Sequence, residues 1–286
     1  MSLGSPRPSI LVPLTVTLAL VAGAILAGPA AGLPVDTEGT VKNKDPKVRN
    51  LNVPHTVTPL AGGDRVVEIS FVAEDGNGKK DVAGGEVVVF DRDNLTVHGT
   101  GSVEAEPVVL DEGEMREFAG TFTMRYWDAP AIGNESYTVR VRVVDEKGSW
   151  SAPQWATFHY EPLAALSLSA AAIDFGEVSP GARSAANELT IQNQGNVRID
   201  LDVSGSSLLH DRSALGPDRV RYSLDALFTD EDALTEAPAT LAGFDLSPGP
   251  SSAKSVWWLL DVPPGSDAYV PAGAYHGSIA IVGLAG

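Results

Sequence analysis

An acidic loop holds the residues of this chain that are best suited to binding an ion. Asp75, Asn77 and Asp81 lie within the short run EDGNGKKD. Carboxylate and amide oxygens are the ligands that Ca²⁺ prefers in proteins, and closely spaced acidic residues in a loop supply them. The pattern therefore makes these three residues candidate metal ligands, with calcium as the cofactor that they would hold.

A plain turn is the competing interpretation of the same run. Lys79 and Lys80 stand where a helix-loop-helix calcium loop needs an oxygen ligand and a glycine. The Asp-Gly-Asn-Gly sequence is also typical of a tight connection between two strands. If the run is only a turn, we expect the protein to have no cofactor. If the run binds calcium, we expect Asp64 or Asp145 to contribute a further ligand.

Two short motifs match the acceptor sequence for N-glycosylation. Asn94 begins Asn-Leu-Thr and Asn134 begins Asn-Glu-Ser, and both lie at expected turns. The motif occurs often by chance, so it indicates a modification only in an exported protein of an organism that glycosylates asparagine.

Five tryptophans could form a sugar-stacking platform if several shared one exposed face. Trp257 and Trp258 are adjacent on an expected strand, so their side chains point to opposite faces and at least one belongs to the core. Large aromatic side chains dominate core burial, which favours packing over a platform. The other three are Trp127, Trp150 and Trp155.

The residues needed for catalysis do not form a recognisable set. The chain has no cysteine, which excludes disulfides, thiolate metal sites and cysteine nucleophiles. It has no Gly-x-Ser-x-Gly nucleophile motif, and none of its histidine pairs has zinc-motif spacing. We therefore expect no enzymatic activity. The scattered histidines are His55, His98, His159, His210 and His276.

The charge of the chain restricts its partners. The formal net charge of the 286 residues is −17 and the isoelectric point is about 4.6. Nucleic acids and anionic membrane surfaces would repel such a protein. We expect no nucleic-acid partner, and a membrane contact only through the N-terminal segment.

Residues 1–32 are typical of an export signal. Arg7 precedes an apolar run from Ile10 to Ala27, and the small residues AGPAAG follow. A cleaved signal peptide is favoured, with a retained membrane anchor as the alternative because the run is long. Both place the rest of the chain outside the cytoplasmic membrane, extracellular or at the cell surface. A polar linker, residues 33–47, follows.

Residues 48–161 are expected to form a first antiparallel sandwich. This region has the period of a strand with two unlike faces, in which Val67, Ile69, Phe71 and Ala73 alternate with Val66, Glu68, Ser70 and Val72. Similar short runs follow, separated by Gly, Asp, Asn and Pro, with no helical repeat. In residues 136–148 a slip of one residue would bury two arginines, so the register is well specified.

Residues 162–286 are expected to form a second sandwich with a long irregular insertion, 206–252, that holds one strand candidate at 219–224. The run 187–205 predicts two half-buried strands joined by a tight turn at residues 193–196. There we expect Gly195 and the asparagines to tolerate positive φ.

Several of these runs resemble known modules. IDFGEVSPG, ELTIQNQGNVRIDLDVSG and VPAGAYHGSIAI resemble an immunoglobulin-like module of secreted archaeal and bacterial surface proteins. VEISFVAEDGNGKKDV and ESYTVRVRVVDEKGSWS are similar to immunoglobulin-like or fibronectin-like repeats of envelope proteins. The resemblance implies an all-β fold of two tandem antiparallel Ig-like β-sandwiches. Such modules serve as spacers, adhesins and filament subunits.

We therefore expect a non-catalytic exported cell-envelope protein with a structural, adhesive or surface-assembly role. Its partners would be other envelope proteins or further copies of itself. One alternative is a carbohydrate-binding protein that attaches a cell or an enzyme to polysaccharide. Another is a filament subunit that donates the extended segment 33–50 as a strand, although its Lys, Asp and Gly content favours a tether.

Overall fold

The chain folds as a set of antiparallel β-sheets. The computed structural model describes residues 38–78, 80–91, 97–104, 115–266 and 269–286. Within these ranges the only helix is one 3₁₀ turn, η1 (Pro217–Arg219), and no helix is long and apolar enough to cross a membrane. The all-β antiparallel class predicted from the sequence is confirmed. The expected signal or anchor at residues 1–32 lies outside the described residues.

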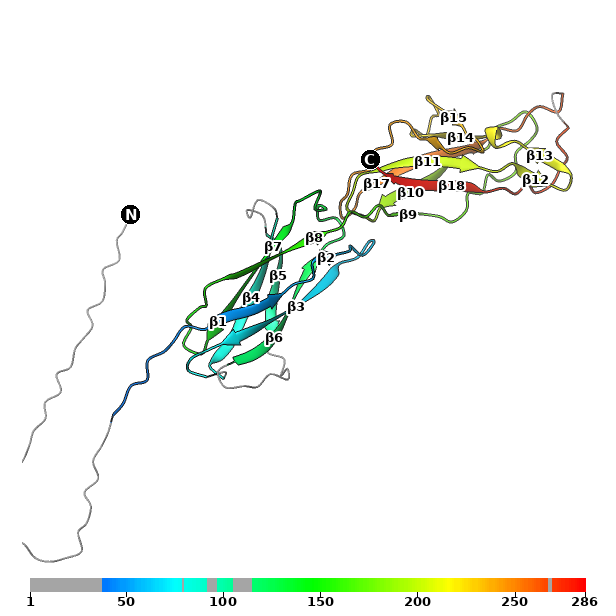
Figure 1. Cartoon of the computed structure of the whole chain (residues 1–286). Helices are drawn as coiled ribbons and strands as arrows, with labels where there is room; N and C mark the ends of the chain where they lie inside the picture. The colour runs from blue at the N-terminus through cyan, green and yellow to red at the C-terminus, as the bar shows by residue number, and fades with distance from the viewer. Residues whose placement is uncertain (1–37, 79, 92–96, 105–114, 267–268) are drawn as a thin grey trace, which may run out of the picture. The chain divides into compact units, whose positions relative to one another are not determined.

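Eight strands form the first sandwich, in the spatial order β1-β3-β6-β5-β4-β7-β8-β2 (Figure 1). Every pair is antiparallel except β2 with β8. Strand β5 pairs with β4 along most of its length and with β6 at its end, so it connects the two layers. The strands are β1 (Lys47–Asn52), β2 (Thr56–Val57), β3 (Arg65–Glu74), β4 (Val82–Phe90), β5 (Val97–Glu104), β6 (Met115–Met124), β7 (Tyr137–Asp145) and β8 (Gln154–Tyr160).

The core of the first sandwich follows the predicted alternation. On β3 the buried residues are Val67, Ile69, Phe71 and Ala73. Those of β3 and β6 face those of β4, β7 and β8, and the rings of Phe122 and Phe158 lie 5.3 Å apart. On β7 the buried face is likewise the predicted one: Tyr137, Val139, Val141 and Val143.

The second sandwich contains a five-stranded sheet, β15-β14-β17-β10-β9, a three-stranded sheet, β16-β11-β18, and the pair β12-β13. Its strands are β9 (Leu166–Leu168), β10 (Asn187–Asn193), β11 (Ile199–Gly205), β12 (Leu208–His210), β13 (Ser213–Leu215), β14 (Val220–Ser223), β15 (Asp232–Ala233), β16 (Ala239–Thr240), β17 (Ala253–Leu260) and β18 (Ile279–Ala285). Its own apolar core includes the fully buried Trp258. The boundary predicted near residue 161 falls between β8 and β9, and the domain ranges stay a prediction.

The region 206–252 is more ordered than expected. The sequence predicted one strand there, and the structure has five, β12 to β16, each two to four residues long. Strands this short carry too few alternating residues to produce a pattern. The region also supplies core residues to the second sandwich: Val220, Tyr222, Leu234, Leu241, Phe244 and Leu246.

The turn at residues 193–196 differs from the prediction. Strands β10 and β11 belong to different sheets, so the turn connects two layers. Gly195 is buried, and neither it nor the two asparagines has positive φ. The glycine is required by close approach, because a Cβ at Gly195 would lie 2.0 Å from the carbonyl oxygen of Leu163.

Two buried asparagines hold this turn in place. Asn193 donates to the carbonyl oxygens of Val197 and Leu246 and accepts from the backbone N–H of Gly195. Asn196 accepts from the backbone N–H of Leu163 at 2.7 Å and donates to the carbonyl oxygen of Glu161 at 2.9 Å. Asn196 therefore fixes the linker between β8 and β9 through hydrogen bonds that leave its amide satisfied.

The segment proposed as a donor strand is shorter than expected. Residues 47–50 belong to β1, which pairs with β3 of the same chain through Lys47 with Glu74 and Val48 with Ala73. Val48 is buried in the first core. A strand already hydrogen-bonded within its own sheet is not available as a donor to another chain. The predicted donor segment, 33–50, is therefore wrong at its C-terminal end, because residues 47–50 belong to β1.

Gly195→Ala should destabilise the second sandwich by about 1–3 kcal/mol, because the added methyl group collides with rigid backbone. Gly265→Ala is the matched control, since a Cβ there meets no heavy atom within 4 Å. Urea unfolding followed by tryptophan fluorescence measures both variants. Equal stability of the two would contradict the close approach of Leu163.

Candidate cation site and exposed aromatic face

Three acidic residues converge at one end of the first sandwich. Asp75 follows β3, Asp81 precedes β4 and Asp145 is the last residue of β7. Strands β4 and β7 pair antiparallel with Val82 opposite Asp145, which brings Asp81 beside Asp145. The backbone N–H of Glu146 donates to the carbonyl oxygen of Asp81 at 2.7 Å and fixes this approach.

The three carboxylates are close enough to share one ion. One oxygen from each lies within 4.8 Å of the others. Asp75 has 0% and Asp145 2% of its surface exposed, and Asp81 is half-buried. The Oδ1 atom of Asp75 accepts from the backbone N–H of Asn77, whereas its Oδ2 has no hydrogen-bond partner among the described residues.

The electrostatics of the cluster differ from one carboxylate to the next. Burial raises the pKa of Asp81, and the nearby carboxylates of Asp75 and Asp145 raise it further because like charges repel. The pKa of Asp145 is lowered, chiefly by the hydrogen bond from Asn43 and also by backbone N–H groups, although desolvation acts against them. Those backbone donors are Lys147 and Ser149.

The structure brings together two of the three predicted ligands, Asp75 and Asp81. The oxygen of Asn77 accepts a hydrogen bond from the backbone N–H of Lys44 at 2.7 Å. Of the two candidates for a further ligand, Asp145 joins the cluster, while Asp64 is exposed and outside it. The ligand role of these residues stays a prediction.

Glu86 is the twelfth residue counted from Asp75, the position of the bidentate glutamate in a helix-loop-helix calcium loop. It lies within β4, and its Oε1 accepts from Arg140 and Arg142. It therefore belongs to a different surface of the sandwich.

The glycosylation motifs are described only in part. Asn134 is exposed at a turn before β7, where an enzyme could reach it. Asn94 lies outside the described residues. Modification of both stays a prediction.

The outer face of β7 and β8 carries an exposed aromatic ladder, formed by Phe90, Arg140, Arg142, Trp150 and Trp155. Trp150 is 43% and Trp155 50% exposed. The guanidinium of Arg142 lies 4.9 Å from the ring centre of Trp150, and that of Arg140 lies 5.2 Å from Phe90 and 6.0 Å from Trp155. These are cation–π distances, so each guanidinium and its ring fix one another.

Glu86 connects the two arginines of the ladder. It forms ion pairs of 3.0 Å with Arg140 and 2.6 Å with Arg142, and about a third of each side chain is exposed. The register places Glu86 directly opposite Arg142 on the neighbouring strand. Glu86, Arg140 and Arg142 taken together carry one net positive charge, on a chain whose net charge is −17.

The other tryptophans pack as expected. Trp258 is fully buried and Trp257, its neighbour on β17, is half-buried, which confirms that the pair points to opposite faces. Trp127 is half-buried beneath the guanidinium of Arg125, 5.3 Å from its ring centre. Only Trp150 and Trp155 are exposed among the five, and both belong to the aromatic ladder.

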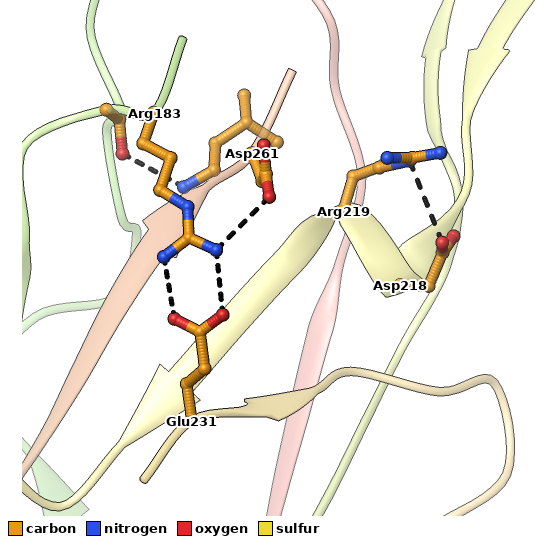
Figure 2. A network of polar contacts seen from close by, with 7 residues as sticks. Arg183, Asp218, Arg219, Glu231 and Asp261 are labelled. Carbon is orange, nitrogen blue, oxygen red and sulfur yellow. Dashed lines mark hydrogen bonds and ion pairs between the residues drawn. The ribbon is translucent and has the colours of Figure 1, made fainter. Parts of the chain in front are cut away.

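A further polar network lies in the second sandwich (Figure 2). Arg183 donates to both carboxylate oxygens of Glu231 at 2.8 Å and to Asp261 at 3.4 Å, and these hydrogen bonds raise the pKa of the guanidinium. Asp218 pairs with its neighbour Arg219 at 3.7 Å. Because Arg183 is engaged by two carboxylates, the network ties the chain before β10 to the residues beside β15 and β17.

A shallow depression beside β11 and β18 is lined by hydroxyl groups and one carboxylate. Ser206 Oγ accepts from the backbone N–H of Ser278 at 3.0 Å and lies 3.3 Å from its hydroxyl. These hydroxyls serve the connection between the two segments. The lining residues are Ser204, Gly205, Ser206, Glu236, Ser278 and Ala280.

Comparison with known proteins gives similarity of structure only. No protein-family model matches the chain, and neither does any curated protein. A chain from a chaperone-tip adhesin complex of CFA/I fimbriae is 10% identical, with 84% of each chain covered and a TM-score of 0.33. The D00-D0 domain of intimin is 12% identical, with 74% of this chain and 85% of that one covered and a TM-score of 0.24.

The sialic acid binding region of a Streptococcus sanguinis adhesin is 9% identical, with 84% of this chain and 74% of that one covered and a TM-score of 0.27. At such identities and TM-scores a function has to be argued from the residues of this chain.

Quenching by acrylamide should separate the exposed tryptophans from the buried one. Trp150→Phe and Trp155→Phe should each reduce the quenchable share of the fluorescence, because these indoles contact solvent. Trp258→Phe should reduce only the protected share. A smaller quenchable share in the Trp258 variant would contradict the burial of Trp258. An unchanged quenchable share in the other two variants would contradict the exposure of Trp150 and Trp155.

Proposed function

We propose that this chain is a non-catalytic, exported cell-surface protein with an adhesive role, and that the aromatic ladder of the first sandwich is its contact face. The observation that carries the proposal is the exposure of Trp150 and Trp155 on one sheet face, each beside an arginine. Tryptophan and arginine are the side chains that most often dominate binding energy at protein surfaces.

The ladder is suited to binding because its side chains are already held in place. Arg140 lies against Phe90 and Trp155, Arg142 lies against Trp150, and Glu86 connects the arginines. Ordering a side chain upon binding costs about 0.5–1.5 kcal/mol, and a prearranged ladder avoids part of that cost. The excess positive charge also favours an anionic partner.

Two further features support a position outside the cell. The N-terminal sequence of residues 1–32 has the pattern of an export signal, and the glycosylation motif at Asn134 lies at an exposed turn. The partner would then be another envelope protein or a surface polymer.

Polysaccharide binding is the second candidate, favoured by the same two exposed indoles. Sugars stack on aromatic faces, and Trp150 and Trp155 lie on one side of the sheet. A guanidinium already occupies one face of Trp150. A sugar would therefore have to use the opposite face or the ring edge, which places general adhesion ahead of polysaccharide binding.

The double variant Trp150→Ala/Trp155→Ala should reduce retention of the protein on isolated cell envelopes at least about tenfold, because it removes two candidate hot-spot side chains. Tyr269→Ala is the matched control, since Tyr269 is an aromatic residue with 87% exposure in the second sandwich. Unchanged retention of the double variant would overturn the proposal. Release of the native protein by soluble polysaccharide alone would assign the ladder to sugar binding.

A further inference from the structure

We propose that Asp75, Asp81 and Asp145 form a calcium site that closes the end of the first sandwich where the N-terminal segment joins it. This inference is independent of the adhesive role of the aromatic ladder. It rests on the convergence of three carboxylates and on a buried oxygen that has no partner within the described ranges.

The unpartnered oxygen is the observation that points to a ligand. Asp75 is completely buried, and its Oδ2 accepts no hydrogen bond from the described part of the chain. Buried polar atoms are nearly always satisfied, and an ionised carboxylate oxygen without a donor is costly. None of the described ion pairs involves these carboxylates, although the charge of Lys147 acts on Asp81. A bound cation would satisfy the oxygen.

The geometry fits calcium. Two oxygens on opposite sides of a Ca²⁺ ion lie about 4.6–5.2 Å apart, twice the usual Ca–O distance. The three carboxylate oxygens all lie within 4.8 Å of one another, so they can share one coordination sphere. Calcium accepts irregular sets of six to eight oxygens and can complete them with water and backbone carbonyls, whereas magnesium demands a near-ideal octahedron.

The fold holds the three ligands without help from the ion. Pairing of β4 with β7 sets Asp81 against Asp145. In the loop between β3 and β4, the backbone N–H of Gly78 donates to the carbonyl oxygen of Asp75, and that of Asp81 donates to the carbonyl oxygen of Gly78. Gly78 has a φ of 116°, which a glycine adopts without strain. The three carboxylates are therefore held in place before an ion binds.

The site also contacts the segment that precedes β1. The side-chain amide of Asn43 donates to Asp145 Oδ2 at 2.7 Å and to Ser149 Oγ at 3.2 Å. The backbone N–H of Lys44 donates to Asn77 in the same acidic loop. An ion that fixes the loop and the end of β7 would also fix Asn43 and Lys44, so calcium would limit the movement of the chain where it joins the sandwich.

Calorimetric titration of the full chain, after removal of divalent ions with a chelator, tests the site. We expect one Ca²⁺ per chain and a higher thermal midpoint with calcium, because an ion that binds only the folded state stabilises it. Asp75→Asn should weaken calcium binding at least about tenfold and abolish the shift, since affinity depends on ligand charge. Asp64→Asn removes the same charge from an exposed position outside the cluster and should retain both responses.

The Asp75 variant also separates metal binding from a structural role. Neutralising a buried carboxylate that has one unpartnered oxygen should leave the calcium-free protein at least as stable as before. Proteolysis at residues 38–46 should slow when calcium is added to the native chain. Weak extracellular sites bind calcium with roughly millimolar affinity, so the absence of binding and of a thermal shift at about ten times that calcium concentration would overturn the proposal. Equal responses of the Asp75 and Asp64 variants to calcium would also overturn it. So would a stronger response of the native chain to Mg²⁺ than to Ca²⁺.

Discussion

The antiparallel register of β4 with β7 is the constraint on which the first sandwich depends. It sets Val87 opposite Val141 and Val89 opposite Val139, which are all fully buried. The same register sets Glu86 opposite Arg142. At the end of the pair it brings Asp81 beside Asp145. One register therefore contributes to the core, to the aromatic ladder and to the acidic cluster.

The register is protected by the difference between the two faces of β7. A shift of one residue would turn Val139 and Val141 outwards and bury Arg140 and Arg142. Burial of two guanidiniums away from Glu86 would be far more costly than any gain elsewhere. The charged residues on the outer face thus specify the pairing as strongly as the valines on the inner face do. The outer face and the core therefore both constrain the register of this strand.

The sequence predicts local features of this fold better than long-range ones. Alternation on β3 and β7 identified the buried faces correctly, because burial of one sheet face leaves a period of two in the sequence. It could not show that β10 and β11 belong to different sheets, since a buried face does not identify the neighbouring strand. The sequence suggests that position 195 needs a glycine because of a positive φ. The structure shows that the glycine is needed because the backbone of Leu163, 32 positions away (195 minus 163), approaches too closely for a Cβ.

The sequence likewise does not show which distant residues join the candidate site. Asp75 and Asp81 are close in sequence and could be grouped by spacing, but Asp145 joins them only through the pairing of β4 with β7. The arginines and tryptophans of the ladder likewise come from β7, β8 and the connection between them, and only the register shows that they alternate in space. The site and the ladder lie at the end and the middle of one strand, β7. An ion bound at Asp145 would therefore hold the end of the strand pair that presents Arg140 and Arg142, while Glu86 holds its middle. The acidic cluster and the aromatic ladder are thus both positioned by β7.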